Sequence, residues 1–393
     1  MKIRVIVPLI LLAFQAVFAG AIEIVSGPYI QNMTETGCDV LWRTDKPATA
    51  WVELAPDDGT HFYLSERPRI YSTDLGRAVV GTFHKVSLTG LKPGTSYRYR
   101  IFSEEVTDMQ PYHVSFGGIA SSKVYPMDPP CFRTVEKNKK DVEFVMINDV
   151  HGKNDVLSDL LSNVKKDKTD FVLYNGDMVD FMDSEDRLFS SFIDTSVNMF
   201  AKEIPTYVSR GNHETRGAIS KDYMKYFPNS NGKPYYSFKY GPCYFVVLDG
   251  GEDKPDSDIE YSGTSFFDDY RKEEAAWLRE TVESEEFCTA PYRIAVIHVP
   301  TVDAVWHGPM HARQLFEPIL NNAGIDLMLC GHLHCYSYHK PDGKDRQFPV
   351  LINSNQDAVV VNADADSMKL KVLDRQGRLL HQFEYPVSHG KVN

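Results

Sequence analysis

Histidine, aspartate and asparagine side chains recur in five short groups along the chain, and each group directly follows an apolar run. The groups occupy residues 148–152, 176–177, 211–214, 298 and 331–334, and five of the 13 histidines of the chain lie in them. Open α/β sheets place their binding sites at the carboxyl ends of the strands. We therefore expect the five groups to form a site at the carboxyl ends of the strands.

The residue types in these groups favour metal-dependent chemistry. Imidazole and carboxylate groups together suit Fe, Mn or Zn, whereas a cage of thiolates would indicate a structural zinc site. A carboxylate that bridges two ions holds them about 3.5–4 Å apart, which suits in-line displacement at phosphorus. Two such ions lower the pKa of a shared water, so that hydroxide is available near neutral pH, and they neutralise the phosphoryl oxygens. Glycine beside the polar residues allows a sharp backbone turn and leaves room for ions and substrate.

From residue 141 onward, short apolar runs alternate with amphipathic segments of helical spacing, and this alternation predicts an α/β domain. The predicted strands cover residues 142–147, 171–174, 205–208, 244–248, 294–297 and 327–329, with a further strand within residues 233–238. The predicted helices are centred on residues 157–164, 188–193, 277–282 and 315–319. Residues 359–361, 368–373 and 379–385 predict a closing β-meander.

Residues 22–135 have the pattern of an all-β domain, because apolar and polar residues alternate in short runs separated by proline and glycine. Residues 91–97 supply a turn followed by a strand that carries Tyr97. This resembles the fibronectin type III sandwich, in which a tyrosine near such a corner bonds back to the backbone. We expect a spacer or packing domain here, with a ligand-binding module as the alternative. A charged linker at residues 136–140 would separate it from an α/β domain at residues 141–393.

The five groups, in their order along the chain, resemble the calcineurin-like metallophosphoesterase family. The motifs are Asp-x-His, Gly-Asp, Gly-Asn-His-Glu, a lone histidine after a strand and Gly-His-x-His, and they extend over roughly residues 141–390. The family's fold is an α/β sandwich of mixed sheets with flanking helices. The resemblance also implies the metal ligands: Asp149, His151 and His334 for one ion, Asn212, His298 and His332 for the other, and Asp177 as the bridge. It further implies that His213 lies beside the leaving group as a proton donor or a phosphate contact.

The β-rich first part and the glutamate of Gly-Asn-His-Glu further resemble the purple acid phosphatases, but two positions depart from them. Purple acid phosphatases carry glycine where this chain has His151, and a tyrosine ligand where it has Asp180. The resemblance therefore implies two ions without an iron–tyrosinate bond, and it leaves their identity open among Fe, Mn and Zn. Glu214 and Asp180 are expected to support the ligands rather than to react.

His307 is a further candidate, because it follows His298 closely enough to reach the same site from the next loop. There it would bind substrate, and the alternative is a histidine satisfied by partners within its own loop. Arg210 and Arg216 offer phosphate contacts, with structural ion pairs as the alternative.

The start of the chain has the pattern of an export signal. Lys2 and Arg4 precede an apolar run that ends near Phe18, and small residues follow it, so residues 1–21 are predicted to be a signal peptide. An uncleaved membrane anchor is the alternative, but the run is shorter than the ~20 residues that a span needs. We expect an exported protein, periplasmic or extracellular, with no integral membrane span after removal of the signal.

The charge balance bears on the substrate. The chain has 42 lysine and arginine residues against 54 aspartate and glutamate residues, a formal charge of −12, and no basic tract. Nucleic acid is therefore not an expected partner, since such binding relies on clustered cations. We expect a hydrolase of small phosphate monoesters. A phosphodiesterase of small diesters is the first alternative, and a non-catalytic binding protein with a vestigial metal site is the second. The specific substrate, the pairing of the six cysteines and the oligomeric state stay open.

Overall fold

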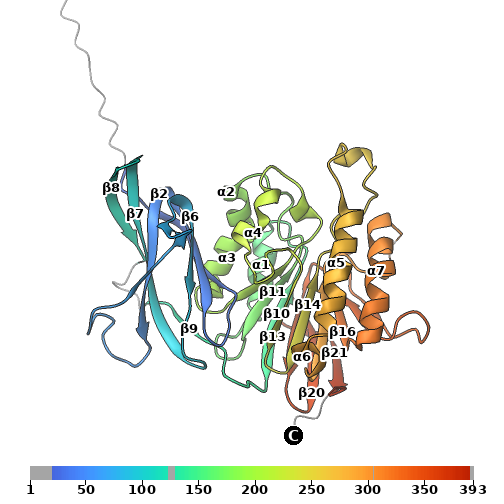
Figure 1. The fold of residues 1–393 in the computed structure, drawn as a ribbon. Coiled ribbons are helices and arrows are strands. Elements are labelled where there is room, and N and C mark those ends of the chain that lie inside the picture. The colour runs from blue at the N-terminus through green and yellow to red at the C-terminus, as the bar shows by residue number, and fades with distance from the viewer. Residues whose placement is uncertain (1–19, 123–128, 304, 390–393) are drawn as a thin grey trace, which may run out of the picture.

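The computed structural model describes residues 20–122, 129–303 and 305–389, so nearly all of the predicted signal peptide lies outside the described residues. Strands make up the first part of the chain, and strands alternate with helices from residue 142 onward, as the hydrophobic pattern predicts (Figure 1). In the described part of the chain, no helix has the length and apolar character needed to cross a membrane.

The N-terminal part is all β and is organised around one long strand. Its elements are β1 (Ile24–Gln31), β2 (Cys38–Pro56), β3 (Arg69–Tyr71), β4 (Thr73–Asp74), β5 (Arg77–Ala78), β6 (Gly81–Leu88), β7 (Ser96–Gln110), β8 (His113–Ser121) and β9 (Cys131–Arg133). Strand β2 pairs antiparallel with β1, β3, β6 and β7. The Tyr97 hydroxyl accepts a hydrogen bond from the backbone N–H of Lys92 at 3.0 Å. This is the bond to the backbone that the turn at residues 91–97 led us to expect.

Two mixed sheets packed face to face form the second part. The first contains β10 (Val142–Ile147), β11 (Phe171–Asn175) and β12 (Thr206–Ser209), which run parallel, and the antiparallel strands β19 (Asp357–Ala363), β20 (Ser367–Asp374) and β21 (Leu379–Pro386). The second has the order β13 (Tyr236–Tyr240), β14 (Cys243–Leu248), β15 (Tyr292–Ile297), β16 (Leu327–Cys330), β18 (Val350–Ile352) and β17 (Ser337–His339). The mixed α/β fold with an all-β N-terminal part is confirmed.

The central strands of both sheets bury both of their faces, because successive side chains point to opposite sides of a sheet and both sides are covered. In β10, Phe144 and Met146 lie in the core between the sheets, whereas Val145 and Ile147 pack against helices. The outer layer of the first sheet holds α1 (Asn154–Leu161), α2 (Glu185–Leu188), α3 (Asp194–Ser196) and α4 (Tyr223–Tyr226), with π-helical turns at Phe189–Ile193 and Val197–Ala201. The outer layer of the second holds α5 (Phe267–Val282), α6 (Glu285–Cys288) and α7 (His307–Ala323) (Figure 1).

The N-terminal strands are joined directly to the first sheet, which the sequence did not predict. Strand β1 pairs parallel with β12 at Gln31 and Thr206, so one sheet runs through both parts of the chain. The Tyr99 hydroxyl adds a hydrogen bond to the carbonyl of Lys202 at 2.7 Å. The N-terminal part therefore packs directly against the side of the α/β part. The boundary between the two parts at residues 136–140 remains a prediction.

Candidate metal centre

All seven candidate ligands lie in loops that follow parallel strands. Asp149 and His151 come after β10, Asp177 after β11 and Asn212 after β12, while His298 follows β15 and the pair His332 and His334 follows β16. Since β10–β12 belong to one sheet and β15–β16 to the other, the loops of both sheets meet at the same end of the sandwich. Three overlapping groups result: Asp149–His151–His334, Asp177–His298–His332 and His151–Asp177–His213. Within each, the ligand atoms lie within 4.8 Å of one another.

The two aspartates occupy the middle of the arrangement. Asp177 Oδ2 lies 3.0 Å from His298 Nε2 and 4.0 Å from His151 Nε2, so its carboxylate faces ligands of both proposed ions. Asp149 Oδ1 lies 3.3 Å from His334 Nε2 and 3.8 Å from His298 Nε2. The amide oxygen of Asn212 lies 3.0 Å from His332 Nδ1, which places the asparagine in the second group.

The backbone is strained at these positions. Among the described residues, ten non-glycine residues have a positive φ, and five of them are candidate ligands. Their φ angles run from 50° to 72°, in the left-handed region that L-residues rarely adopt. Such strain costs on the order of 1–3 kcal/mol per residue, persists only where the surroundings hold it, and concentrates at functional sites. The five residues are Asp149, His151, Asp177, His332 and His334.

Two glycines are required here for steric reasons. A Cβ on Gly176, which has a φ of +80°, would meet the ring of His298 at 2.4 Å. A Cβ on Gly211 would meet Asp177 Oδ1 at 2.2 Å. Glycine therefore lets the loops approach closely enough for the ligands to converge, as the sequence pattern led us to expect.

The donor set fits metal ions. Among the described residues, Asp149 Oδ1 and His298 Nε2 are fully buried without a hydrogen-bond partner. A buried polar atom left unpaired costs about 1–3 kcal/mol, and more when the group is charged. Imidazole nitrogens and carboxylate oxygens in this arrangement suit Fe, Mn or Zn.

Comparison with known proteins agrees with this geometry. Residues 142–336 match the calcineurin-like phosphoesterases, and residues 28–121 match the N-terminal domain of purple acid phosphatases. The first match includes every candidate ligand. The chain contains a calcineurin-like phosphoesterase domain and has the domain plan of a purple acid phosphatase.

Several relatives are purple acid phosphatases of Arabidopsis thaliana. Purple acid phosphatase 21 of Arabidopsis thaliana is 25% identical over 276 residues, which cover 66% of this chain and 54% of the relative. Purple acid phosphatase 18 of the same plant is 23% identical over 324 residues, covering 77% and 63%. The chain thus spans little more than half the length of these relatives. The structure of purple acid phosphatase PPD1 from yellow lupin (Lupinus luteus) seeds matches with a TM-score of 0.67 at 14% identity. The match covers 91% of this chain and 74% of the lupin chain, and it shows a similar fold.

The charges of the candidate centre act strongly on one another. Burial lowers the pKa of His298, but the carboxylates of Asp177 and Asp149 outweigh burial and raise it to about 10. Burial likewise opposes ionisation of Asp177, yet His298 and His213 hold the pKa of this carboxyl below its usual range. The two buried carboxylates thus require positive charge beside them, and bound cations satisfy the same requirement.

Three asparagine positions to which the sequence assigned no role orient the ligands. The backbone carbonyl of Asn175 accepts the Nδ1 hydrogen of His298 at 2.7 Å, so His298 Nε2 faces the carboxylates. The Asn148 amide donates to Asp149 Oδ2 at 2.7 Å, and Asn353 in turn donates to Asn148 at 2.8 Å. Asn353 follows β18, so its place after a strand was a usable signal.

Asp180 and His213 lie on the open side of the centre. Asp180 Oδ1 lies 3.1 Å from His151 Nδ1, and this hydrogen bond orients the imidazole ring, as expected for a supporting residue. His213 donates its Nδ1 hydrogen to the backbone carbonyl of Asp180 at 2.8 Å, which leaves Nε2 directed to Asp177 Oδ2 at 3.9 Å. His213 therefore faces the centre with an unprotonated nitrogen in its neutral form.

The structure places the remaining candidates outside the ligand groups. His307 Nε2 contacts Asp268. Together with Asp268 and His311 it forms a separate cluster, apart from the seven candidate ligands. Arg210 pairs with Asp249 at 2.6 Å and Arg216 with Glu252 at 2.5 Å. Both arginines thus form the structural ion pairs that were the alternative to phosphate contacts.

Glu214 ties the loops of the centre together. Its buried carboxylate accepts backbone hydrogen bonds from Asp177 and Gly211 at one oxygen, both at 2.9 Å. The other oxygen accepts from Met178 at 2.8 Å and Val179 at 3.4 Å. Burial and the Asp177 carboxylate raise the pKa of Glu214 to about 7, and the backbone donors oppose this. One side chain thus fixes the loop after β11 to the loop after β12.

Replacing Glu214 with glutamine is expected to lower the free energy of unfolding by about 2–4 kcal/mol. The amide nitrogen would face two backbone donors, and hydrogen bonds to charged groups contribute roughly 1.5–3 kcal/mol each. The measurement is the urea unfolding midpoint at pH 8, where the carboxylate is ionised, with Glu280→Gln on the exposed face of α5 as the matched control. Equal midpoints for Glu214→Gln and the unmodified protein would contradict this role.

Proposed function

We propose that this chain is an exported phosphoesterase that uses two metal ions to hydrolyse small phosphate monoesters. The observation that carries the proposal is the position of Asp177, whose carboxylate lies within 4.0 Å of both His298 and His151. One carboxylate between two sets of ligands is the arrangement of a dinuclear centre. The proposal of export rests on the signal-like sequence of residues 1–21.

The residues have separate tasks in this proposal. Asp149, His151 and His334 hold one ion, and Asn212, His298 and His332 hold the other, with Asp177 shared between them. Bound Fe, Mn or Zn supplies an ionised water near neutral pH and neutralises the phosphate oxygens. His213 moves the proton to the leaving oxygen, since its Nε2 faces the centre from the open side.

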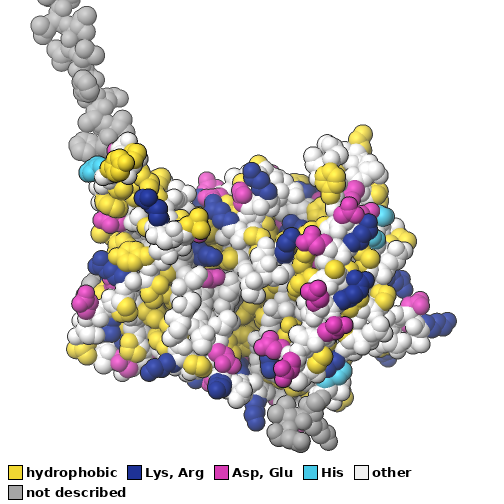
Figure 2. Space-filling model, in the orientation of Figure 1, with side chains coloured by type: hydrophobic (Ala, Val, Ile, Leu, Met, Phe, Trp, Pro, Cys, Tyr) yellow, Lys and Arg dark blue, Asp and Glu magenta, His cyan; other side chains and the backbone are white. Residues whose placement is uncertain are grey.

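An acidic loop at the edge of the centre supports a small substrate. Residues 250–269 carry seven acidic side chains and one lysine. Asp253 Oδ2 in this loop lies 3.9 Å from His332 Nε2, so negative charge reaches the rim of the proposed site. A polyanion would meet repulsion there, whereas one phosphate group passes to the ions. On the face shown in Figure 2, acidic and basic side chains are interspersed, which differs from the basic stripe of nucleic-acid-binding proteins.

The test compares three substrate classes with one preparation. The protein is stripped with a chelator, reloaded separately with Fe, Mn or Zn, and assayed for kcat/KM on a monoester, a small diester and single-stranded DNA at one salt concentration. We expect activity to return only with metal and to be highest for the monoester. A preference for the diester would make the chain a phosphodiesterase, and efficient DNA cleavage that barely depends on salt would contradict the electrostatic argument.

A further inference from the structure

A second cluster of metal-binding side chains lies between the first turns of α5 and α7. His307 and His311 stand one helical turn apart on α7, and their rings stack with centroids 5.6 Å apart. Both rings face Asp268 of α5. His307 Nε2 lies 2.8 and 3.0 Å from the two carboxylate oxygens, and His311 Nδ1 lies 3.1 Å from Asp268 Oδ1.

His311 is the unusual member of this cluster. Its side chain is only 15% exposed, and within the described part of the chain its Nδ1 is a buried atom without a hydrogen-bond partner. The nearby Asp268 oxygen is close enough but is not aligned for a hydrogen bond. A buried imidazole nitrogen without a hydrogen-bond partner is unfavourable, and a cation bound beside it would supply the missing partner.

We propose that Asp268, His307 and His311 form a third metal site, separate from the dinuclear centre, which binds a Zn²⁺ ion. Two imidazoles and one carboxylate are a common three-ligand set for zinc, with water in the fourth position. Zinc bonds of about 2.0–2.2 Å in tetrahedral geometry set ligand atoms roughly 3.3–3.5 Å apart. The present distances of 2.8–3.1 Å need only a small opening to reach that spacing.

The surroundings leave the carboxylate able to bind an ion. Arg271, which is fully buried, holds Asp268 Oδ1 at 3.0 Å and so fixes the carboxylate in place. A carboxylate offers about four lone-pair positions, so this contact leaves other positions free for a metal. The exposed fractions of His307 (40%) and Asp268 (33%) leave the fourth position open to water.

The site would hold the start of α7 against the acidic loop at the edge of the candidate dinuclear centre. The backbone N–H of Gly308, next to His307, donates to the carbonyl of Asp253 at 2.6 Å. The Asp253 side chain is the carboxylate that lies 3.9 Å from His332. An ion that joins α5 to α7 therefore immobilises the start of α7 and the acidic loop packed against it.

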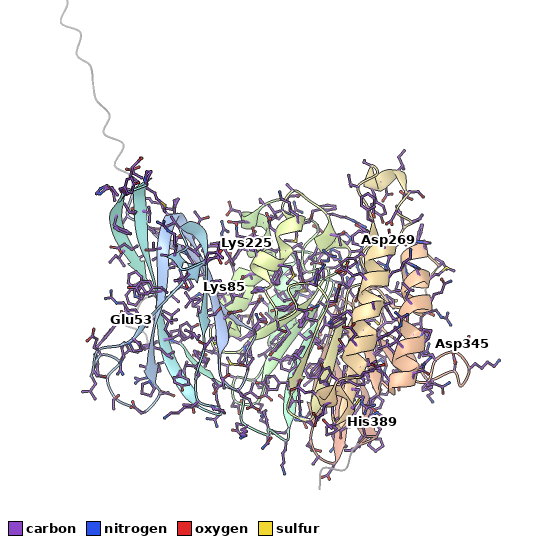
Figure 3. The ribbon with its side chains drawn as sticks, in the orientation of Figure 1. Glu53, Lys85, Lys225, Asp269, Asp345 and His389 are labelled. Atoms are coloured by element: carbon purple, nitrogen blue, oxygen red, sulfur yellow. The ribbon has the colours of Figure 1, made fainter. Side chains whose placement is uncertain are left out.

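The test counts zinc ions bound to the full chain. Chelator-stripped protein is dialysed to equilibrium against Zn²⁺, and metal per chain is measured by elemental analysis for the unmodified protein, His311→Ala and Asp268→Asn. We expect each variant to lose one equivalent. Asp269→Asn, which changes the exposed neighbour labelled in Figure 3, and His113→Ala are controls that should lose none. The expected difference in zinc content between each variant and the unmodified protein is the same whether the central ligands hold two ions, one or none. This test is therefore independent of the proposed function.

A second measurement avoids substitutions. Diethyl pyrocarbonate modifies accessible unprotonated imidazoles, and mass spectrometry locates the modified residue. Zn²⁺ should slow modification of the peptide that carries His307 and His311 several-fold, and leave the exposed His113 unchanged. Equal zinc content in His311→Ala and the unmodified protein, or modification at His307 that is indifferent to Zn²⁺, would overturn the proposal.

Discussion

Asp177→Asn is expected to lower kcat/KM by about 10³-fold or more and to reduce the bound metal below two ions per chain. An asparagine would keep one oxygen and place an amide NH₂ where Oδ2 now faces His298 at 3.0 Å. An NH₂ group has no lone pair for a metal, so the shared ligand is lost for at least one ion. Metal-ion stabilisation contributes several kcal/mol to a transition state, and about 4 kcal/mol corresponds to ~10³-fold in rate.

The measurement pairs elemental analysis of metal-loaded protein with kcat/KM on a phosphate monoester. Asp183→Asn is the matched control, because Asp183 lies nearby in sequence but is 52% exposed and pairs only loosely with Arg187 at 3.7 Å. The control should retain both ions and full activity. If Asp177→Asn bound two ions and kept its activity, the shared carboxylate would not be the bridge.

His213→Ala is expected to keep both ions and to lower kcat by about 10²–10⁴-fold, the usual contribution of general acid–base catalysis. Its ring is held by the carbonyl of Asp180 at 2.8 Å, with Nε2 toward the open side of the centre. The side chain is 25% exposed, so it can exchange its proton with solvent between turnovers. Loss of this group should harm the departure of a basic leaving group most.

The decisive readout is the dependence of kcat on the leaving group. A series of aryl and alkyl phosphates should show the smallest loss for the most acidic leaving group, since such a group departs without a proton. His381→Ala, far along the chain in β21, serves as a control for histidine loss. Because His213 also falls into a metal-capable group with His151 and Asp177, loss of metal from His213→Ala would instead make it a ligand.

Much of the fold could be predicted from the local pattern of apolar and polar residues. The run at residues 142–147 coincides with β10, and the predicted strand at residues 244–248 falls within β14. These strands are buried on both faces and have nearly continuous apolar sequences, interrupted only by Glu143 in β10. The histidines and aspartates of the site could be predicted for a related reason. Polar groups directly after buried strands are typical of binding sites in α/β sheets, and five such groups recur in this chain.

The sequence by itself determined the residue types, their order and the strands that carry them, because hydrophobic periodicity and the chemistry of each side chain are local properties. Only the tertiary structure decided which atoms meet. The continuity of β1 with β12, the backbone donors of residues 177–179 to Glu214 and the pairing of His307 with Asp268 join residues 35 to 175 positions apart. Contacts of that kind depend on how two sheets and their helices pack, and no local pattern records the packing.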